Sequence, residues 1–373
     1  MYNQSLPGTS MQQDCNLNAG IQIPAHIKSV RHFSKAAKKA IPKKVFDTVK
    51  HQLMAARYNN LPLISTNQRR NCPDFIETLT GSTVKLRQYI NSKDCDGNTA
   101  LMRAAIADNA DYINMLLEAG ADTEVQNKDG YTVLMIAADK GHTDCIKALT
   151  ENADKSKFDI DNRGYDGNTA LMVACLAGKT GCIIALAKAG ADTEIKNRDG
   201  YTALMIAADI NSTDDIKALK ENTTTELTQN NLGISLIRAA GAKSTDCVNA
   251  LLKAGAKPDF QNELGTTALF MAIKGGHIEL IEVLRKAGAN LNLKTKSGHT
   301  ALTKAAQIGS VDCLKAIIKI FELRSDHLSC ALIAAAKVNN AGCISLLLEA
   351  GANPNFQNEL GTTALFMAIK GGH

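Results

Sequence analysis

One ten-residue string, D-G-x-T-A-L-M-x-A-A, recurs along the 373-residue chain and limits its fold more than any other feature. Clear copies are DGNTALMRAA (96–105), DGYTVLMIAA (129–138), DGNTALMVAC (166–175) and DGYTALMIAA (199–208), and weaker copies follow downstream. With its Gly as a marker, the string recurs at positions 97, 130, 167, 200, 233, 265, 298, 328 and 361, where Leu328 replaces one Gly. A period near 33 residues indicates a stack of small repeated units.

Each unit predicts a turn followed by two helices. A Thr or Ser two residues after the marker suits a helix N-cap, because its hydroxyl can accept from an unpaired first-turn N–H. The helix that follows carries an Ala pair and stops at a Gly-containing break such as Gly141. A second, amphipathic helix then ends in A-G-A, where Gly supplies a left-handed turn. The predicted capping residues are Thr99, Thr132, Thr169, Thr202, Ser235, Thr267, Thr300 and Thr363.

This organisation resembles the ankyrin repeat, which has the same period, a turn and two helices. The resemblance covers roughly residues 71–373, although the chain reads T-A-L-M where the family typically reads T-P-L-H. Ala is an excellent helix former and replaces the family's proline without breaking the helix. The resemblance implies an all-α solenoid, an ankyrin-repeat array of stacked helix-turn-helix units joined by β-turn or hairpin fingers.

The repeat register divides the chain into four parts. We expect a basic N-terminal segment at 1–70, partly disordered or amphipathic-helical, and a degenerate capping repeat at 71–96. Eight ankyrin-like repeats follow at 97–360, and a half repeat at 361–373. The half repeat is expected to expose Leu365, Phe366 and Ile369, so its end is either truncated or docked on another surface. Blocks are also duplicated, since 119–139 matches 189–209 at 17 of 21 positions.

Charge is distributed unevenly between the N-terminal segment and the repeats. Residues 1–70 hold 11 Lys/Arg and 2 Asp/Glu, a net of +9, whereas residues 71–373 hold 31 and 35, a net of −4. The basic segment suits an anionic surface such as a membrane, the cytoskeleton or a nucleic acid. Alternatively, its apolar residues within 43–57 pack on the first repeat and its lysines stay solvated, which is the interpretation we favour.

Motifs for catalysis or cofactor binding are not found. The A-G-K-T string at 177–180 lacks the first Gly of a phosphate-binding loop, because Val173 stands there. Five cysteines share one position on the second helices and are predicted to be small buried hydrophobes. We therefore predict a protein that is not an enzyme, with no cofactor, no metal and no small-molecule substrate, and no DNA-specific motif is present. The five cysteines are Cys145, Cys182, Cys247, Cys313 and Cys343.

Surface recognition remains as the expected function. The resemblance implies a non-enzymatic scaffold or adaptor that binds a partner protein through turn tips and the face of the first helices. Exposed Tyr offers large contact area at low entropic cost, so tyrosines at turn tips stand out. Whether Ile136, Val173 and Ile206 contact a partner or only pack on neighbouring helices stays open. The predicted partner-binding residues are Tyr131, Tyr201, Lys128, Arg198, Arg103, Asn98 and Asn168.

Localisation is predicted from two missing signals. The chain has no apolar run near 18 residues, and its N-terminus lacks a basic start followed by an apolar core. We therefore expect a cytoplasmic protein, with cytoskeletal or nuclear association as the alternative. The identity of its unidentified protein partner cannot be derived from these residues.

Overall fold

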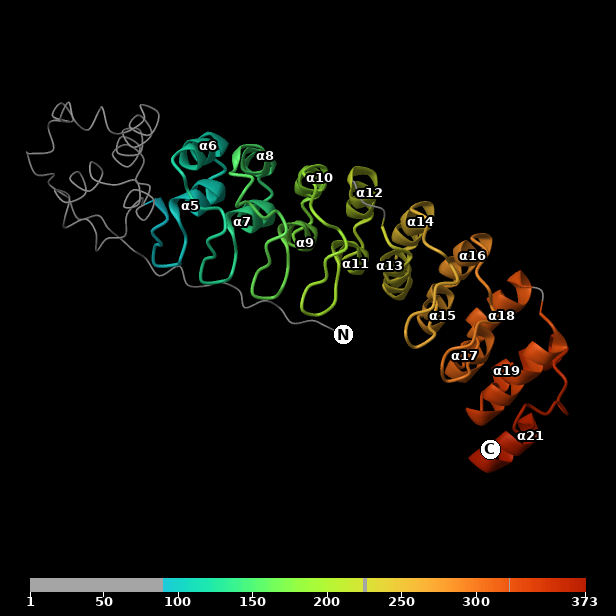
Figure 1. Ribbon diagram of the computed structural model, residues 1–373. Coiled ribbons are helices and arrows are strands. Elements are labelled where there is room, and N and C mark those ends of the chain that lie inside the picture. Colours follow the sequence, from blue (N-terminus) through green and yellow to red (C-terminus); the bar gives the residue numbers. More distant parts are fainter. Residues whose placement is uncertain (1–89, 224–226, 322) are drawn as a thin grey trace, which may run out of the picture.

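The computed structural model describes residues 90–223, 227–321 and 323–373. Within them the chain forms 17 helices and no strand. The predicted basic segment at 1–70 lies outside the described residues, as does most of the predicted capping repeat at 71–96. The all-α solenoid is confirmed, and its helices alternate between two layers (Figure 1).

The first helix of each repeat lies in an inner layer beside the turns, and the second lies in an outer layer (Figure 1). The inner helices are α5 (Ala100–Ile106), α7 (Val133–Lys140), α9 (Ala170–Leu176), α11 (Ala203–Asp209), α13 (Gln229–Gly241), α15 (Ala268–Lys274), α17 (Ala301–Ile308), α19 (Ser325–Lys337) and α21 (Ala364–Gly371). The outer helices are α6 (Ala110–Glu118), α8 (Thr143–Asn152), α10 (Thr180–Lys188), α12 (Thr213–Asn222), α14 (Thr245–Lys253), α16 (Ile278–Lys286), α18 (Val311–Ile320) and α20 (Ala341–Glu349).

Threonine caps begin seven of the inner helices, as predicted. Thr99 accepts a hydrogen bond from the backbone N–H of Met102, and the same contact recurs three residues after each later cap. The contact satisfies one of the N–H groups that the first turn of a helix leaves unpaired. The caps that repeat it are Thr132, Thr169, Thr202, Thr267, Thr300 and Thr363.

The predicted cap at Ser235 is wrong. Ser235 lies fully buried in the middle of α13, which begins at Gln229 and is capped by Thr228. No Asx-Gly turn precedes this helix, so the chain starts it earlier and runs for 13 residues. The same happens at α19, whose cap position is Arg324 without a side-chain cap bond. These two repeats therefore lack the turn that the other repeats carry.

A tight five-residue turn, here called a finger, precedes each of the other inner helices. In the first finger the backbone N–H of Asp94 donates to Asn98 O at 3.0 Å, and the N–H of Gly97 donates to Asp94 O at 3.0 Å. The marker glycines have φ near +80°, a conformation that glycine adopts without strain. The seven fingers span 94–98, 127–131, 164–168, 197–201, 262–266, 295–299 and 358–362.

One residue in the link between the two helices of every repeat adopts a left-handed backbone. Glycine stands there in four repeats, as at Gly141 and Gly309. The other four repeats place an L-residue at this position, which costs free energy except where Asn or Asp can bond locally. These four residues are Asp108 (φ 53°), Asn211 (φ 60°), Lys243 (φ 62°) and Asn339 (φ 54°).

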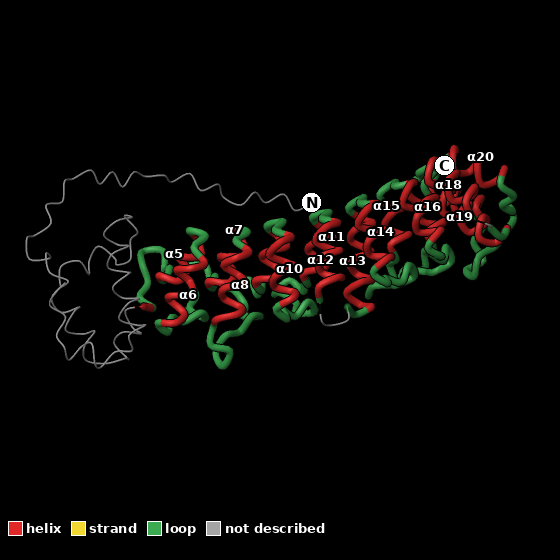
Figure 2. Tube along the Cα trace, turned by 90° about the horizontal axis from the view of Figure 1, so that it is seen from above, coloured by secondary structure: helices red, strands yellow, loops and turns green. Residues whose placement is uncertain are grey.

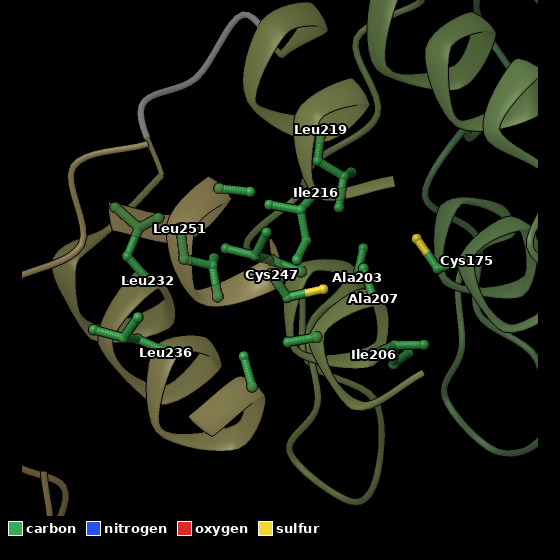
Figure 3. Packing of buried hydrophobic residues seen from close by; sticks show 14 of the residues in the cluster. Cys175, Ala203, Ile206, Ala207, Ile216, Leu219, Leu232, Leu236, Cys247 and Leu251 are labelled. Carbon is green, nitrogen blue, oxygen red and sulfur yellow. The ribbon is translucent and has the colours of Figure 1, made fainter. Parts of the chain in front are cut away.

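The core lies between the two helix layers and continues from repeat to repeat (Figure 3). Leucine and isoleucine from both layers meet there, with the alanine pairs of the inner helices at 0–4% exposure. The five repeat-encoded cysteines, such as Cys247 in Figure 3, are 0–1% exposed, so their predicted role as small buried hydrophobes is confirmed. Small side chains at these positions let neighbouring helices approach closely.

The array is elongated and bends toward the fingers, so the fingers and inner helices line its concave side (Figures 1 and 2). At the far end, α21 exposes Leu365, Phe366 and Ile369 at 69%, 55% and 68%, as predicted. None of the helices in the described part of the chain is both long and apolar enough to span a lipid bilayer.

Candidate functional site

Asparagine side chains organise the fingers and connect them to one another. The Asn127 Oδ1 atom accepts from the N–H groups of Asp129 and Tyr131 at 3.0 and 2.9 Å, which closes the turn. Its Nδ2 donates to Asn98 Oδ1 of the preceding finger at 3.1 Å. Two repeats further on, Asn197 makes the same set of contacts, including one to Asn168 Oδ1 at 2.9 Å. The first four fingers are thus hydrogen-bonded in two pairs.

The prediction that Asn98 and Asn168 are exposed at turn tips is wrong. They are 7% and 6% exposed, because the next finger covers each of them. Their amide oxygens are already engaged by Asn127 and Asn197. These buried, hydrogen-bonded carboxamides stabilise the pairing of the fingers.

Lys128 and Arg198 are exposed, as the prediction requires. Each anchors its finger to the preceding one, since their N–H groups donate to Asp96 O at 3.3 Å and to Asp166 O at 3.1 Å. Each of them also packs against the marker glycine of the preceding finger. A Cβ on Gly97, for example, would meet the Lys128 backbone N at 2.8 Å and the Lys128 Cγ at 3.1 Å. The charged ends remain at the surface, where they can contact a partner.

Arg103 is engaged within the chain. Its Nε donates to Asp94 Oδ2 at 2.6 Å, and its Nη2 lies 2.7 Å from Asp96 Oδ2. Burial alone would raise the pKa of Asp94, but hydrogen bonds from Arg103 and from backbone N–H groups hold it below its ordinary value. Arg103 therefore braces the first finger against α5, and a partner would have to compete with two carboxylates for it.

Tyr131 and Tyr201 are half-buried. The guanidinium of Arg238, from the next inner helix α13, lies over the Tyr201 ring with its Cζ 4.0 Å from the centroid. Arg238 Nη1 also lies 2.6 Å from Asp209 Oδ2. Sequence reasoning missed Arg238, although aligning GISLIRAA by its Ala pair would have placed it in register with Arg103.

The question left open for Ile136, Val173 and Ile206 has a clear structural answer. They are 6%, 3% and 5% exposed, so they pack against adjacent helices.

A set of exposed apolar residues lies instead at the C-terminal ends of inner helices or one residue beyond. Nothing in the repeat pattern marked them, because the same positions are charged or small in other repeats. They are Ile106, Leu176, Ile210, Ile308 and Val338.

Two groups of side chains place potential metal ligands within 4.8 Å of one another, but both are engaged in internal bonds. In the first, His142 Nδ1 lies 2.7 Å from Ala105 O, and Cys145 Sγ donates to Asp108 Oδ1 at 3.5 Å. Burial, helped by Asp108, raises the pKa of the Cys145 thiol to about 12, which disfavours the thiolate that a metal needs. The second group contains Asp94 and Asp96, which pair with Arg103.

The geometry defines a helical-repeat protein whose concave side presents fingers and helix ends as its accessible surface. Family models for ankyrin repeats match nearly the whole array: "Ankyrin repeats (3 copies)" at residues 53–159, 156–231 and 236–327, and "Ankyrin repeat" at 328–359. The chain belongs to the ankyrin-repeat family.

Similar proteins share parts of the array. The Notch-regulated ankyrin repeat-containing protein of Homo sapiens is 38% identical over 85 residues, which is 23% of this chain and 75% of that protein. Notch-regulated ankyrin repeat-containing protein B of Danio rerio is 39% identical over 64 residues, 17% of this chain and 58% of that protein. The ankyrin repeat domain of Bcl-3 superimposes with a TM-score of 0.50 at 23% identity, covering 65% of this chain and 95% of that domain. This last likeness shows the fold alone.

Proposed function

We propose that this protein is a non-enzymatic scaffold or adaptor that binds a partner protein on the concave side of its array. Ankyrin repeats generally mediate protein–protein interaction. The observation that carries the proposal is the surface composition of the first four repeats. Exposed Ile106 and Leu176 alternate there with the carboxylates of Asp139 and Asp209, beside the half-buried Tyr131. Apolar and aromatic area framed by charge is typical of a protein interface.

We retain Lys128, Tyr131, Arg198 and Tyr201 as the partner-binding residues of this surface. The fingers hold them in fixed positions through the asparagine contacts, so little conformational entropy is lost when a partner binds. We further propose that the protein acts in the cytoplasm, where reducing conditions keep its buried cysteines as free thiols.

Affinity purification of the full-length chain from a cell lysate tests this proposal. The double variant Tyr131→Ala with Tyr201→Ala should lose its bound partners, because two large contact areas are removed. A matched control, Lys217→Ala with Lys253→Ala on the outer helices, should keep them. Unchanged partners in the tyrosine variant and lost partners in the control would show that another face binds.

A second function is favoured by the charge of the N-terminal segment. Its net charge of +9 suits an anionic surface, so an alternative proposal is a targeting adaptor whose head binds that surface while the repeats recruit a partner. Expressing residues 1–70 fused to a fluorescent protein separates the two proposals. Diffuse fluorescence would contradict the targeting role, whereas a membrane, filament or nuclear pattern would support it.

A further inference from the structure

The first half of the array contains two copies of the same structural unit. Residues 119–139 and 189–209 match at 17 of 21 positions, so Tyr131 and Asp139 occupy the places of Tyr201 and Asp209. Each Tyr ends a finger, and each Asp lies near the end of the inner helix that follows it. Because the two Tyr–Asp pairs consist of the same residues, any difference in what they bind must come from the residues around each pair.

The second copy holds a cation. Arg238 stacks on the Tyr201 ring at 4.0 Å and pairs with Asp209 Oδ2 at 2.6 Å. A guanidinium suits this geometry because it is planar, weakly hydrated and able to stack and donate at the same time. The arginine is supplied by α13, which reaches the pair directly because its repeat has no finger.

The first copy lacks an internal arginine. Val173 stands in the register of Arg238 and is 3% exposed, so it packs in the core. Among the described residues no arginine or lysine lies over the Tyr131 ring. Among the described residues Asp139 forms an ion pair only with its exposed neighbour Lys140, at 2.9 Å, and such surface pairs contribute little to stability.

The surroundings of the first copy also favour a cation. Burial raises the pKa of Tyr131, and the negative charges of Asp166, Asp139 and Asp129 raise it further. The Tyr165 ring packs over the adjacent Gly130 and remains 56% exposed, which adds a second aromatic surface. Repeats 97–232 carry 21 Asp/Glu against 13 Lys/Arg, a net of −8, which attracts cationic partners from a distance.

We propose that Tyr131 and Asp139 bind an arginine side chain of the partner protein, in the way that Tyr201 and Asp209 hold Arg238. This rests on the proposed function, because the arginine is contributed by the protein that docks on the concave side. Ile106 and Leu176 end the inner helices on either side of α7, so the arginine is flanked by apolar residues in the partner. An arginine of that partner cannot take the cation position of the second copy, since Arg238 already fills it.

The test uses the full-length chain with 13C-labelled tyrosine rings and the peptide acetyl-Gly-Leu-Arg-Leu-Gly-amide as the probe. The chain has seven tyrosines, so single Tyr→Phe variants assign the resonance of each ring. Titration should shift the Tyr131 signal with a Kd on the order of 1 mM, while the Tyr201 signal stays in place. Replacing the arginine of the peptide by citrulline keeps the shape but removes the charge, and should abolish the shift.

Three variants complete the test. Asp139→Asn should weaken binding of the peptide about three- to fivefold, whereas the exposed Asp192→Asn should leave it unchanged. Arg238→Met empties the second copy, so the Tyr201 signal should then respond to the peptide as well. Equal shifts with citrulline, or no effect of Asp139→Asn, would overturn the arginine site.

The outcome is separable from that of the proposed function. A partner recovered on the concave side that binds Asp139→Asn as tightly as the unaltered chain would leave the scaffold function standing and refute this site. Conversely, a saturating, charge-dependent response of Tyr131 without any partner from lysate would support the arginine site and count against the scaffold function.

Discussion

Asp215 shows how one residue can depart from the repeat without disturbing the fold. It occupies the position that holds cysteine in five other repeats, and it is fully buried on α12. Its Oδ1 accepts from the Thr180 hydroxyl at 2.6 Å, but its Oδ2 has no hydrogen-bond partner. A buried carboxylate with an unpaired oxygen costs free energy that its place near a helix N-terminus offsets only in part.

We expect Asp215→Cys to stabilise the protein by about 1–2 kcal/mol, because the unpaired buried oxygen is removed. The Thr180 hydroxyl would then face a thiol, as Thr213 faces Cys247 at 3.4 Å. Urea unfolding measures the change, and the neighbouring exposed Asp214→Cys serves as the control with no gain. A loss of stability in Asp215→Cys would mean that the bond from Thr180 outweighs the burial of the charge.

Lys243 carries backbone strain that other repeats avoid. Its φ of 62° costs an ordinary L-residue roughly 1–2 kcal/mol, whereas Gly at the same link adopts it freely. Lys243→Gly should therefore gain about 0.5–1 kcal/mol after the added entropy of the unfolded chain is subtracted. The control is Asn249→Gly in the middle of α14, which should lose about 1 kcal/mol in the same thermal unfolding experiment. Destabilisation by both substitutions would show that the link is not strained.

At the scale of helices, α13 allows two N-cap residues to be compared: Thr228, which caps the helix, and Ser235, which the repeat string predicts as its cap. Thr228 accepts from the N–H of Asn231 at 3.3 Å, whereas the buried Ser235 hydroxyl has no partner. Thr228→Ala should cost about 1 kcal/mol through the lost cap, and Ser235→Ala should be neutral or stabilising. Chemical denaturation of the two variants compares them directly. If Ser235→Ala were the more damaging change, α13 would begin where the repeat string places it.

These helix starts show what the sequence could and could not predict. Seven inner helices were predictable because a threonine cap and a Gly-containing turn give local signals for the start. The start of α19 was not, since both signals are missing, and the start of α13 was not, since its capping Thr228 has no such turn before it and lies outside the repeat register. Asn98 was misplaced for a different reason, because its burial depends on Asn127 in the next repeat.

The candidate binding surface was predictable only in part. Lys128 and Arg198 were found because a position beside a Gly turn is exposed in most contexts. Arg238 was missed because its repeat has no finger, which shifts the register of the string by one residue. The exposed Leu176 could not be distinguished from core residues, since the sequence pattern is the same whether an apolar residue at a helix end is exposed or buried.

At the scale of the whole molecule, each repeat depends on its neighbours for burial, and one sequence occurs in two such environments. The segment ALFMAIK forms α15 within the array and most of α21 at its end. In α15, Leu269 and Ile273 are 1% and 0% exposed because neighbouring helices cover them. Their counterparts Leu365 and Ile369 are 69% and 68% exposed in α21. Propensity is the same in both places, so any difference in stability comes from packing.

We expect the amides of α21 to exchange with solvent on the order of 100-fold faster than those of α15, because burial of a Leu and an Ile contributes roughly 3 kcal/mol or more to holding a helix closed. Hydrogen exchange with mass spectrometry on the full-length chain measures both segments in one sample, and their shared sequence cancels intrinsic exchange rates. Adding Leu365→Ser and Ile369→Ser should change the exchange of α21 little, whereas Leu269→Ser should speed exchange across α15 and the repeats beside it. Equal protection of the two segments in the monomer would contradict nearest-neighbour stabilisation, and protection of α21 that grows with protein concentration would show that another chain covers it.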